Sequence, residues 1–165
     1  MNKYLLVFAV AAAVLFLDQL TKWYVRETVS LYESIPVIDS FFHITHVRNR
    51  GGAFSLFAGA SETIRIPFFL TVSGIAITVL AYMVRRVEAH QLLLLLALGC
   101  ILGGALGNFV DRASVGEVTD FFDVHWRGYY WPAFNVADSA ISVGMVTLVL
   151  HSLLGHDLGD RPRQA

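Results

Sequence analysis

The stretch LLLLLALGCILGGALGNFV at residues 92–110 contains no charged side chain. A helix needs about 20 mostly apolar residues to cross the hydrocarbon core of a bilayer, so this stretch predicts a membrane-spanning helix. Three further stretches are also mostly apolar and predict spans at about 4–24, 66–84 and 135–154. In the first of these, the apolar run continues past the alanines at 11–13, which favours a spanning helix over a cleaved signal peptide.

The composition supports a membrane protein of mainly α class with four transmembrane helices. Of the 165 residues, 56% are hydrophobic and 15% are charged, whereas soluble domains carry about 25% charged residues. The formal net charge of −1 leaves no basic surplus for a nucleic-acid backbone. The length predicts a single integral-membrane domain over 1–165.

The lengths of the loops predict which of them share a side of the membrane. With four spans, the long loops at about 25–65 and 111–134 lie on one side, and the short loop at 85–91 lies on the other side with both termini. The twelve lysines and arginines divide almost evenly between the sides, so the positive-inside rule does not settle the orientation. The polar tail at 155–165 is expected to be disordered.

The long loops contain segments with strand character. Residues 40–47 are rich in Phe, Ile, Thr and Val and predict one or two short strands. Residues 118–124, with the aromatic run at 129–131, suit an edge strand and interfacial anchoring. We therefore expect a small β-sheet that caps the long-loop side.

Two carboxylates interrupt the apolar spans, Asp18 and Asp138. Ionisable groups inside a membrane are costly and are functional candidates by default. Both lie near the long-loop side and could face one site. For Asp18 a structural role is an open alternative, as a helix cap or a partner of Lys22 or Arg26.

A third carboxylate, Asp120, precedes two phenylalanines in the second long loop. That loop can return Asp120 above the start of the fourth helix, beside Asp138. Two carboxylates in a poorly solvated site share one proton and can act as base and acid on a single water, as in aspartic proteases. By spacing alone, Asp111, Glu117 and Asp123 compete as loop carboxylates.

Small and polar residues mark one face of the third span. Gly99, Gly103 and Gly107 recur every four residues, so a neighbouring helix can approach closely. Asn108 follows directly, and its carboxamide needs hydrogen-bond partners.

Other chemistry is not favoured. His43 and His46 are spaced to point to opposite faces of a strand and have no evident third ligand, so we predict no metal site. Cys100, inside an apolar run, is expected to serve packing. His151 is too far away to activate a serine, and no cofactor is expected.

Five motifs occur in order along the chain. They are DQLTK at 18–22, NRGGAFS at 49–55, GGALGNFVDR at 103–112, VTDF at 118–121 and WPAFNVADS at 131–139. Together they closely resemble the lipoprotein signal peptidases of bacteria, the type II signal peptidases. Gly52 stands where alanine is more often expected.

The resemblance implies an intramembrane aspartic endopeptidase with Asp120 and Asp138 as the catalytic pair. Its substrate is a diacylglyceryl-modified prolipoprotein, cut immediately before the lipid-modified cysteine. Which aspartate is the base stays undecided, because a coupled pair titrates as a unit. The implied supporting or substrate-binding residues are Asp18, Asn49, Gly52, Asn108, Arg112, Asn135 and Ala137.

The resemblance also implies a location in the bacterial cytoplasmic membrane, with both termini cytoplasmic and the cap on the outer, periplasmic side. The expected partners are the lipid-modified substrate and membrane lipid, and the chain is expected to be monomeric.

Two other classes of function are open alternatives. A small proton- or ion-coupled transporter subunit would use buried carboxylates as a relay, but its polar groups should lie near the midplane and on both sides of it. A membrane assembly factor explains the cap and the glycines but not the converging carboxylates.

Overall fold

The computed structural model describes residues 2–51 and 59–154. Within these residues, four helices are long and apolar enough to cross a membrane, which confirms the predicted fold class. They are α1 (Lys3–Thr28), α2 (Glu62–Arg86), α3 (Leu92–Ser114) and α4 (Val136–Leu154). Gly52 and the predicted tail at 155–165 lie outside the described residues.

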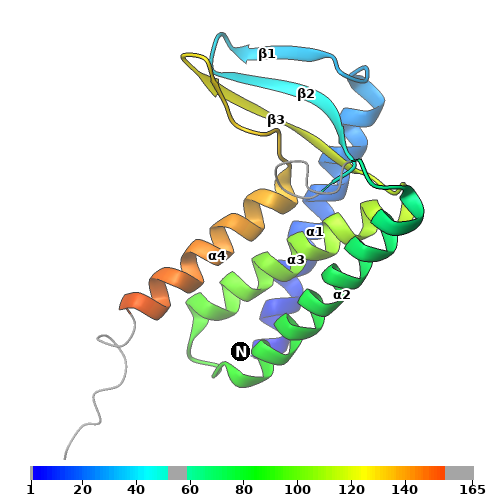
Figure 1. The fold of residues 1–165 in the computed structure, drawn as a ribbon. Helices are drawn as coiled ribbons and strands as arrows, with labels where there is room; N and C mark the ends of the chain where they lie inside the picture. Colours follow the sequence, from blue (N-terminus) through cyan, green and yellow to red (C-terminus); the bar gives the residue numbers. More distant parts are fainter. Residues whose placement is uncertain (1, 52–58, 155–165) are drawn as a thin grey trace, which may run out of the picture.

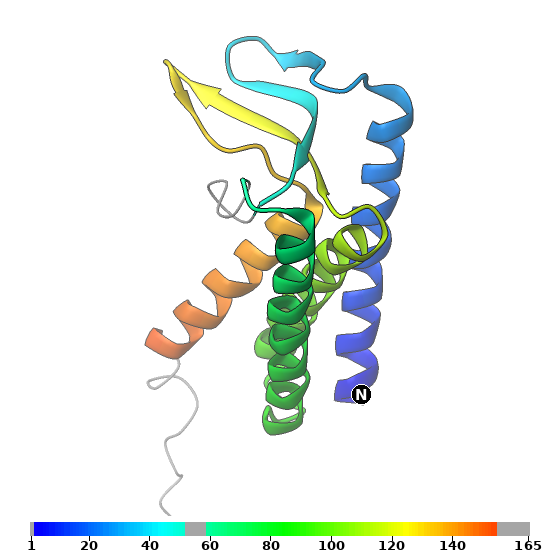
Figure 2. The same ribbon diagram turned by 45° about the vertical axis from the view of Figure 1, so that its right-hand side comes forward.

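Helix α3 is the centre of the helical layer and contacts α1, α2 and α4 (Figures 1 and 2). Its Leu95 and Leu98 are fully buried, and they pack with residues of α1 and α2. By contrast, Phe8 on α1 and Leu153 on α4 are at least 70% exposed. Such apolar outer faces suit contact with lipid.

The glycine face of α3 allows the close approach that the sequence predicts. A Cβ atom at Gly103 would lie 2.6 Å from the backbone oxygen of Ala11 on α1, and one at Gly107 would collide with the carboxylate of Asp18. Any side chain at these positions would separate α1 from α3 near the polar residues described below.

An antiparallel sheet forms from the loops and lies at one end of the helices (Figure 1). In the described residues its strands follow the order β1 (Ser34–Ile38), β2 (Phe42–Asn49), β3 (Val118–Trp126) and β4 (Tyr129–Tyr130). The predicted cap sheet is therefore present. The strand expected at 118–124 is not an edge strand, because β3 is paired with β2 on one side and with β4 on the other. On this side of the sheet the edge is β4, within the aromatic run.

A two-residue turn joins β3 to β4. Arg127 and Gly128 have φ angles of 50° and 85°, the positive values that a type I′ hairpin turn requires. The turn leaves Trp126, Tyr129 and Tyr130 exposed, as expected for aromatic side chains at a membrane interface.

The inner end of the sheet is fixed to α1. Phe121 of β3 is buried against Val25 and Val29. In the β2–β3 register, Val47 lies opposite Asp120 and Asn49 lies opposite Val118. This packing holds the start of β3 and the end of β2 over the ends of the helices.

Candidate active site

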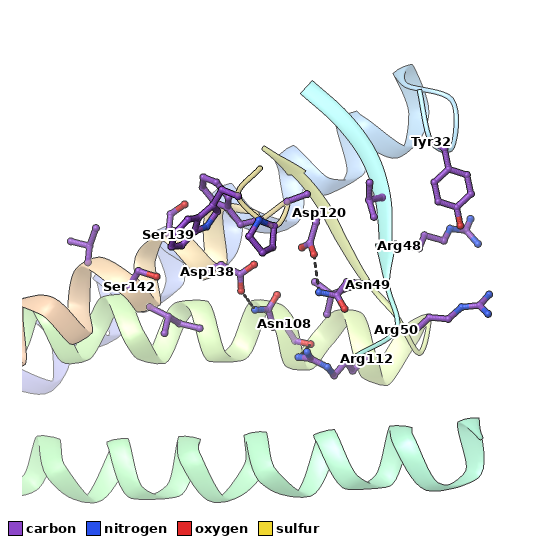
Figure 3. Close-up of a pocket in the computed structure, with 18 residues that line it drawn as sticks. Tyr32, Arg48, Asn49, Arg50, Asn108, Arg112, Asp120, Asp138, Ser139 and Ser142 are labelled. Atoms are coloured by element: carbon purple, nitrogen blue, oxygen red, sulfur yellow. Dashed lines mark hydrogen bonds between the residues drawn. The ribbon is translucent and has the colours of Figure 1, made fainter. Parts of the chain in front are cut away.

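Asp120 and Asp138 reach one cavity from two different elements (Figure 3). Asp120 is near the start of β3, and Asp138 is in the first turn of α4. The cavity has a volume of about 1220 Å³, and it runs from the sheet down one side of α4. Its polar and charged lining residues are Tyr32, Arg48, Asn49, Arg50, Asn108, Arg112, Asp120, Asp138, Ser139 and Ser142.

Asn135 links the two aspartates. It precedes the first residue of α4, and its Oδ1 accepts a hydrogen bond from the backbone N–H of Asp138 at 2.9 Å, as an N-cap residue does. Its Nδ2 donates to Oδ1 of Asp120 at 2.7 Å. A carboxamide can make both bonds, whereas an ionised aspartate at this cap has no donor for Asp120.

Asn49 and Asn108 each donate a hydrogen bond to one of the two carboxylates, Asn49 to Asp120 and Asn108 to Asp138. Nδ2 of Asn49 donates to Oδ2 of Asp120 at 3.0 Å, while its Oδ1 accepts from the backbone N–H of Gly51. Nδ2 of Asn108 donates to Oδ1 of Asp138 at 2.8 Å. Both carboxylates are therefore fixed in orientation.

The surroundings of Asp120 favour its protonated form. Its side chain is buried, and burial together with the nearby charge of Asp138 raises the pKa of Asp120 from its ordinary value of 3.8 to about 7. The hydrogen bonds from Asn49 and Asn135 oppose this rise. Asp138 lies in the first turn of α4, and its Oδ1 accepts the hydrogen bond from Asn108.

A buried lysine underlies the site. Nζ of Lys22 lies 2.8 Å from Oδ2 of Asp18 and 2.9 Å from Oδ2 of Asp111, and the side chains of Lys22 and Asp18 are 0% exposed. Lys22 also donates to Oδ1 of Asn108 at 3.0 Å. The other end of that carboxamide holds Asp138, so the lysine fixes the orientation of Asn108.

Asp18 is not among the residues that line the cavity. It is instead an ion-pair partner of Lys22, one of the structural alternatives that the sequence left open. Besides its ion pair with Lys22, its Oδ1 accepts a hydrogen bond from the backbone N–H of Ala137 at 2.8 Å. Asp18 therefore joins the first span to the first turn of the last one. Ala137 is fully buried, and it contributes this backbone group rather than a surface for substrate.

Arg112 brings a positive charge to the cavity. Its guanidinium lies 4.8 Å from the ring centre of Phe69 and donates to the backbone oxygens of Asn108 and Gly51, each at 3.4 Å. It lines the same cavity as the two aspartates.

The loop carboxylates that competed with Asp120 have other partners. Asp111 pairs with Lys22, Glu117 pairs with Arg50, and Asp123 lies beside two histidines on the sheet. None of the three lines the cavity formed by the described residues.

From the sequence, Lys22 was a possible partner of Asp18 and Asp111 was a competing loop carboxylate, but neither was expected to support the site. A signal for Lys22 was present, because a lysine four residues after a carboxylate shares its helix face. No comparable signal identified Asp111, whose side chain lies 1% exposed between α1 and α3.

Comparisons with known proteins agree with these features. A family model described as signal peptidase (SPase) II matches residues 10–154. A protein of Geobacter sulfurreducens named lipoprotein signal peptidase is 52% identical over 142 residues, which cover 86% of this chain and 88% of that protein. One of the same name from Bacillus velezensis is 40% identical and covers 97% of this chain and 100% of its own length.

A solved bacterial membrane enzyme, determined by the in meso method, has a similar fold. It superposes with a TM-score of 0.85 at 31% identity, and the match covers 96% of this chain and 94% of that one.

Proposed function

The chain belongs to the signal peptidase II family, and on that premise we propose that it removes the signal peptide of diacylglyceryl-modified prolipoproteins as an aspartic endopeptidase. Cleavage falls immediately before the lipid-modified cysteine. The observation that carries the proposal is the pair Asp120 and Asp138, which point into one cavity and are oriented by asparagines.

The proposed reaction divides the acid and base roles between the two carboxylates. Asp138 is assigned the role of the base, and it takes a proton from water as the water oxygen attacks the scissile carbonyl carbon. Asp120 holds the shared proton and donates a hydrogen bond to the developing oxyanion. As the intermediate collapses, the proton on Asp138 passes to the leaving amine of the cysteine.

The shape of the cavity supports a lipid-modified substrate. It is bounded by the sheet and by Ile141 and Val143 of α4, and Val143 is 63% exposed on the face that suits lipid. Acyl chains can remain in the bilayer beside α4 while the peptide bond reaches the aspartates. Arg112 supplies a positive charge for substrate carbonyl groups or headgroup oxygens.

The placement in the cell follows from the same proposal. The N-terminus of α1 and the α2–α3 connection lie at the end of the helices opposite the sheet (Figure 1). We place that end, with both termini, in the cytoplasm and the sheet on the outer side of the bacterial cytoplasmic membrane, where the exported precursor presents its cleavage site. The protein acts as a monomer, since one chain supplies both aspartates.

The comparisons give no support to the transporter alternative. The polar residues Asp18, Asn108 and Asp138 also gather at one end of the helices, under the sheet, rather than across the midplane.

A side-by-side assay with lipidated and unlipidated precursor peptides of one sequence tests the proposed substrate. The lipidated peptide is expected to have a kcat/KM at least about 100-fold higher, equivalent to about 2.7 kcal/mol, because its acyl chains hold the scissile bond at the membrane surface. Cleavage is measured by gel shift and mass spectrometry. Equal rates for the two peptides contradict the proposal.

Asn49→Ala is expected to change the pH dependence of cleavage. In the wild type, kcat/KM should fall as the pH rises through about 7, because Asp120 loses the shared proton there. Asn49 donates to the ionised carboxylate, so its removal raises the pKa of Asp120 further. The alkaline limb should move up by about one pH unit, from the strength of a hydrogen bond to a charged group.

The matched control is Asn2→Ala, which removes a helix-capping asparagine from the far end of α1 and should leave the pH profile unchanged. An alkaline limb that stays in place or moves to lower pH in Asn49→Ala refutes the assignment of the proton to Asp120.

A further inference from the structure

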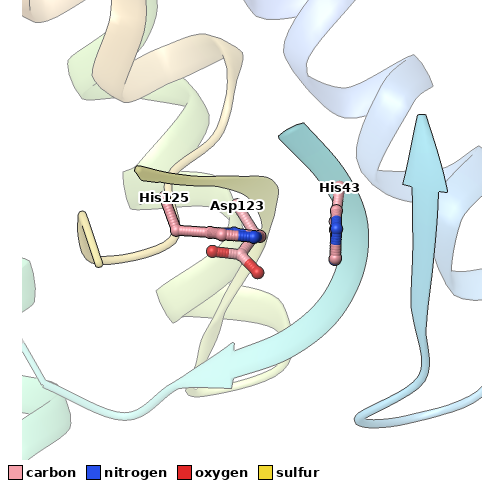
Figure 4. A group of neighbouring side chains, drawn as sticks. All are labelled: His43, Asp123 and His125. Carbon is pink, nitrogen blue, oxygen red and sulfur yellow. The ribbon is translucent and has the colours of Figure 1, made fainter. Parts of the chain in front are cut away.

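The outer end of the sheet carries a cluster of metal-binding side chains that the proposed reaction does not use. We infer that His43, Asp123 and His125 form a site for a divalent transition metal, with Zn²⁺ as its best occupant (Figure 4). A ring nitrogen from each histidine and a carboxylate oxygen of Asp123 lie within 4.8 Å of one another.

The strand register creates this cluster. His43 of β2 lies directly opposite Asp123 of β3, where facing side chains are closest. His125 is two residues further along β3, so it points to the same face as Asp123. The spacing in sequence does not predict the cluster, because the histidine nearest to His43 in sequence is His46. The ring of His46 is buried and contacts the backbone oxygen of Val29 instead.

The two imidazoles are available for coordination. Nδ1 of His43 lies 3.0 Å from Oγ of Ser34. In the tautomer in which Nδ1–H donates to that hydroxyl, the lone pair of Nε2 is left for a metal, the usual arrangement of a metal-binding histidine. Nδ1 of His125 is buried and has no hydrogen-bond partner among the described residues. The rings of His43 and His125 meet edge to face, with centres 4.6 Å apart.

The donor set indicates the class of metal. Two imidazoles and one carboxylate suit Zn²⁺ and related borderline ions, whereas Ca²⁺ and Mg²⁺ prefer oxygen ligands alone. All three residues are partly exposed, so an ion can enter from water, and a water molecule can complete four-coordination.

The site lies away from the two aspartates, and its effect is expected to be structural. Asp123 is three residues from Asp120, about 10 Å along an extended strand. Because successive side chains of a strand point to opposite faces, Asp123 lies on the face opposite to Asp120. A metal held by β2 and β3 would join the outer ends of both strands, while their inner ends carry Asn49 and Asp120. Metal binding should therefore stabilise the sheet.

Zinc binding to the full-length, untagged protein in detergent tests this inference. Competition with a chromogenic chelator should give one Zn²⁺ per chain, and Co²⁺ should give the visible absorption of a four-coordinate site. Zn²⁺ should also raise Tm. His43→Gln and Asp123→Asn should each weaken binding at least about 100-fold and abolish the Tm shift, whereas Ser34→Ala should weaken binding about tenfold, as loss of a supporting hydrogen bond does.

The matched control is His90→Ala. His90 is an exposed histidine beside Glu88, in the connection at the other end of the helices, and its loss should leave zinc affinity unchanged. Circular dichroism and elution volume show whether each variant is folded. The inference is overturned if the wild type binds no stoichiometric zinc, or if folded His43→Gln and Asp123→Asn bind it as tightly as His90→Ala does.

Discussion

Asp120→Asn is expected to lower kcat for cleavage of a lipidated precursor by about 10⁴-fold, at the upper end of what general acid–base groups contribute. An amide cannot hold the proton shared with Asp138, and its N–H is a much weaker acid than a carboxyl O–H, so the developing oxyanion is stabilised far less. Asp138→Asn should lose as much, because no other carboxylate among the described residues lines the cavity. Single-turnover cleavage measured by mass spectrometry reads both losses directly.

The double variant makes this prediction specific. Two residues that act as one unit are strongly non-additive, so Asp120→Asn/Asp138→Asn should be no slower than either single variant. Asp39→Asn, an exposed carboxylate in the turn between β1 and β2, is the control and should retain full activity. Turnover retained in a folded Asp120→Asn or Asp138→Asn protein would falsify the aspartic mechanism.

Lys22→Met is expected to destabilise the protein by about 3–5 kcal/mol, the usual cost of removing one partner from a buried ion pair. The change leaves Asp18 without its cation and Asp111 with Arg26, whose nitrogen is 3.7 Å away. Oδ1 of Asn108 loses its shorter hydrogen bond and keeps the one from Nδ2 of Asn135 at 3.4 Å. Thermal unfolding in detergent should show the loss, and kcat should fall more than KM rises because the orientation of Asp138 depends on Asn108.

Neutralising the whole ion group should restore the fold. In Asp18→Asn/Lys22→Met/Asp111→Asn the three buried charges are removed together, and such replacements of buried ion pairs are often neutral. Arg26 loses its pairing with Asp111, but its side chain is 29% exposed and can be solvated. Lys3→Met is the control, since Lys3 is the other lysine of the chain and its Nζ donates to backbone oxygens at the C-terminal end of α2. A Lys22→Met protein as stable as Lys3→Met contradicts the role assigned to Lys22.

The helices could be predicted from the sequence because length and hydropathy are properties of one continuous segment. The run at 92–110 and its three counterparts needed no knowledge of contacts to be identified as spans. The glycine face of α3 was equally readable, since its period alone shows that one side lacks bulk. These features are local, and the structure contains them where the residues predict them.

The supports of the candidate site could not be predicted in the same way. The sequence left Asp18 with a choice among a site role, a cap and two cationic partners. That choice depends on how closely α1 approaches α3, because the space beside Gly107 admits the Asp18 carboxylate and buries Lys22 with it. The cluster at His43 was invisible for a related reason, since only the pairing of β2 with β3 brings Asp123 and His125 to it.

The hydrogen bond from Ala137 to Asp18 also has a consequence for the order of events during synthesis. It joins α1 to α4, which is made after the other three described helices, and Asp138 arrives with α4. Until α4 has entered the membrane and docked beside α3, the nascent chain holds Asp120 without its partner. On the proposed mechanism, the unfinished protein therefore cannot cleave its neighbours, and the docking of α4 is the step that begins proteolysis.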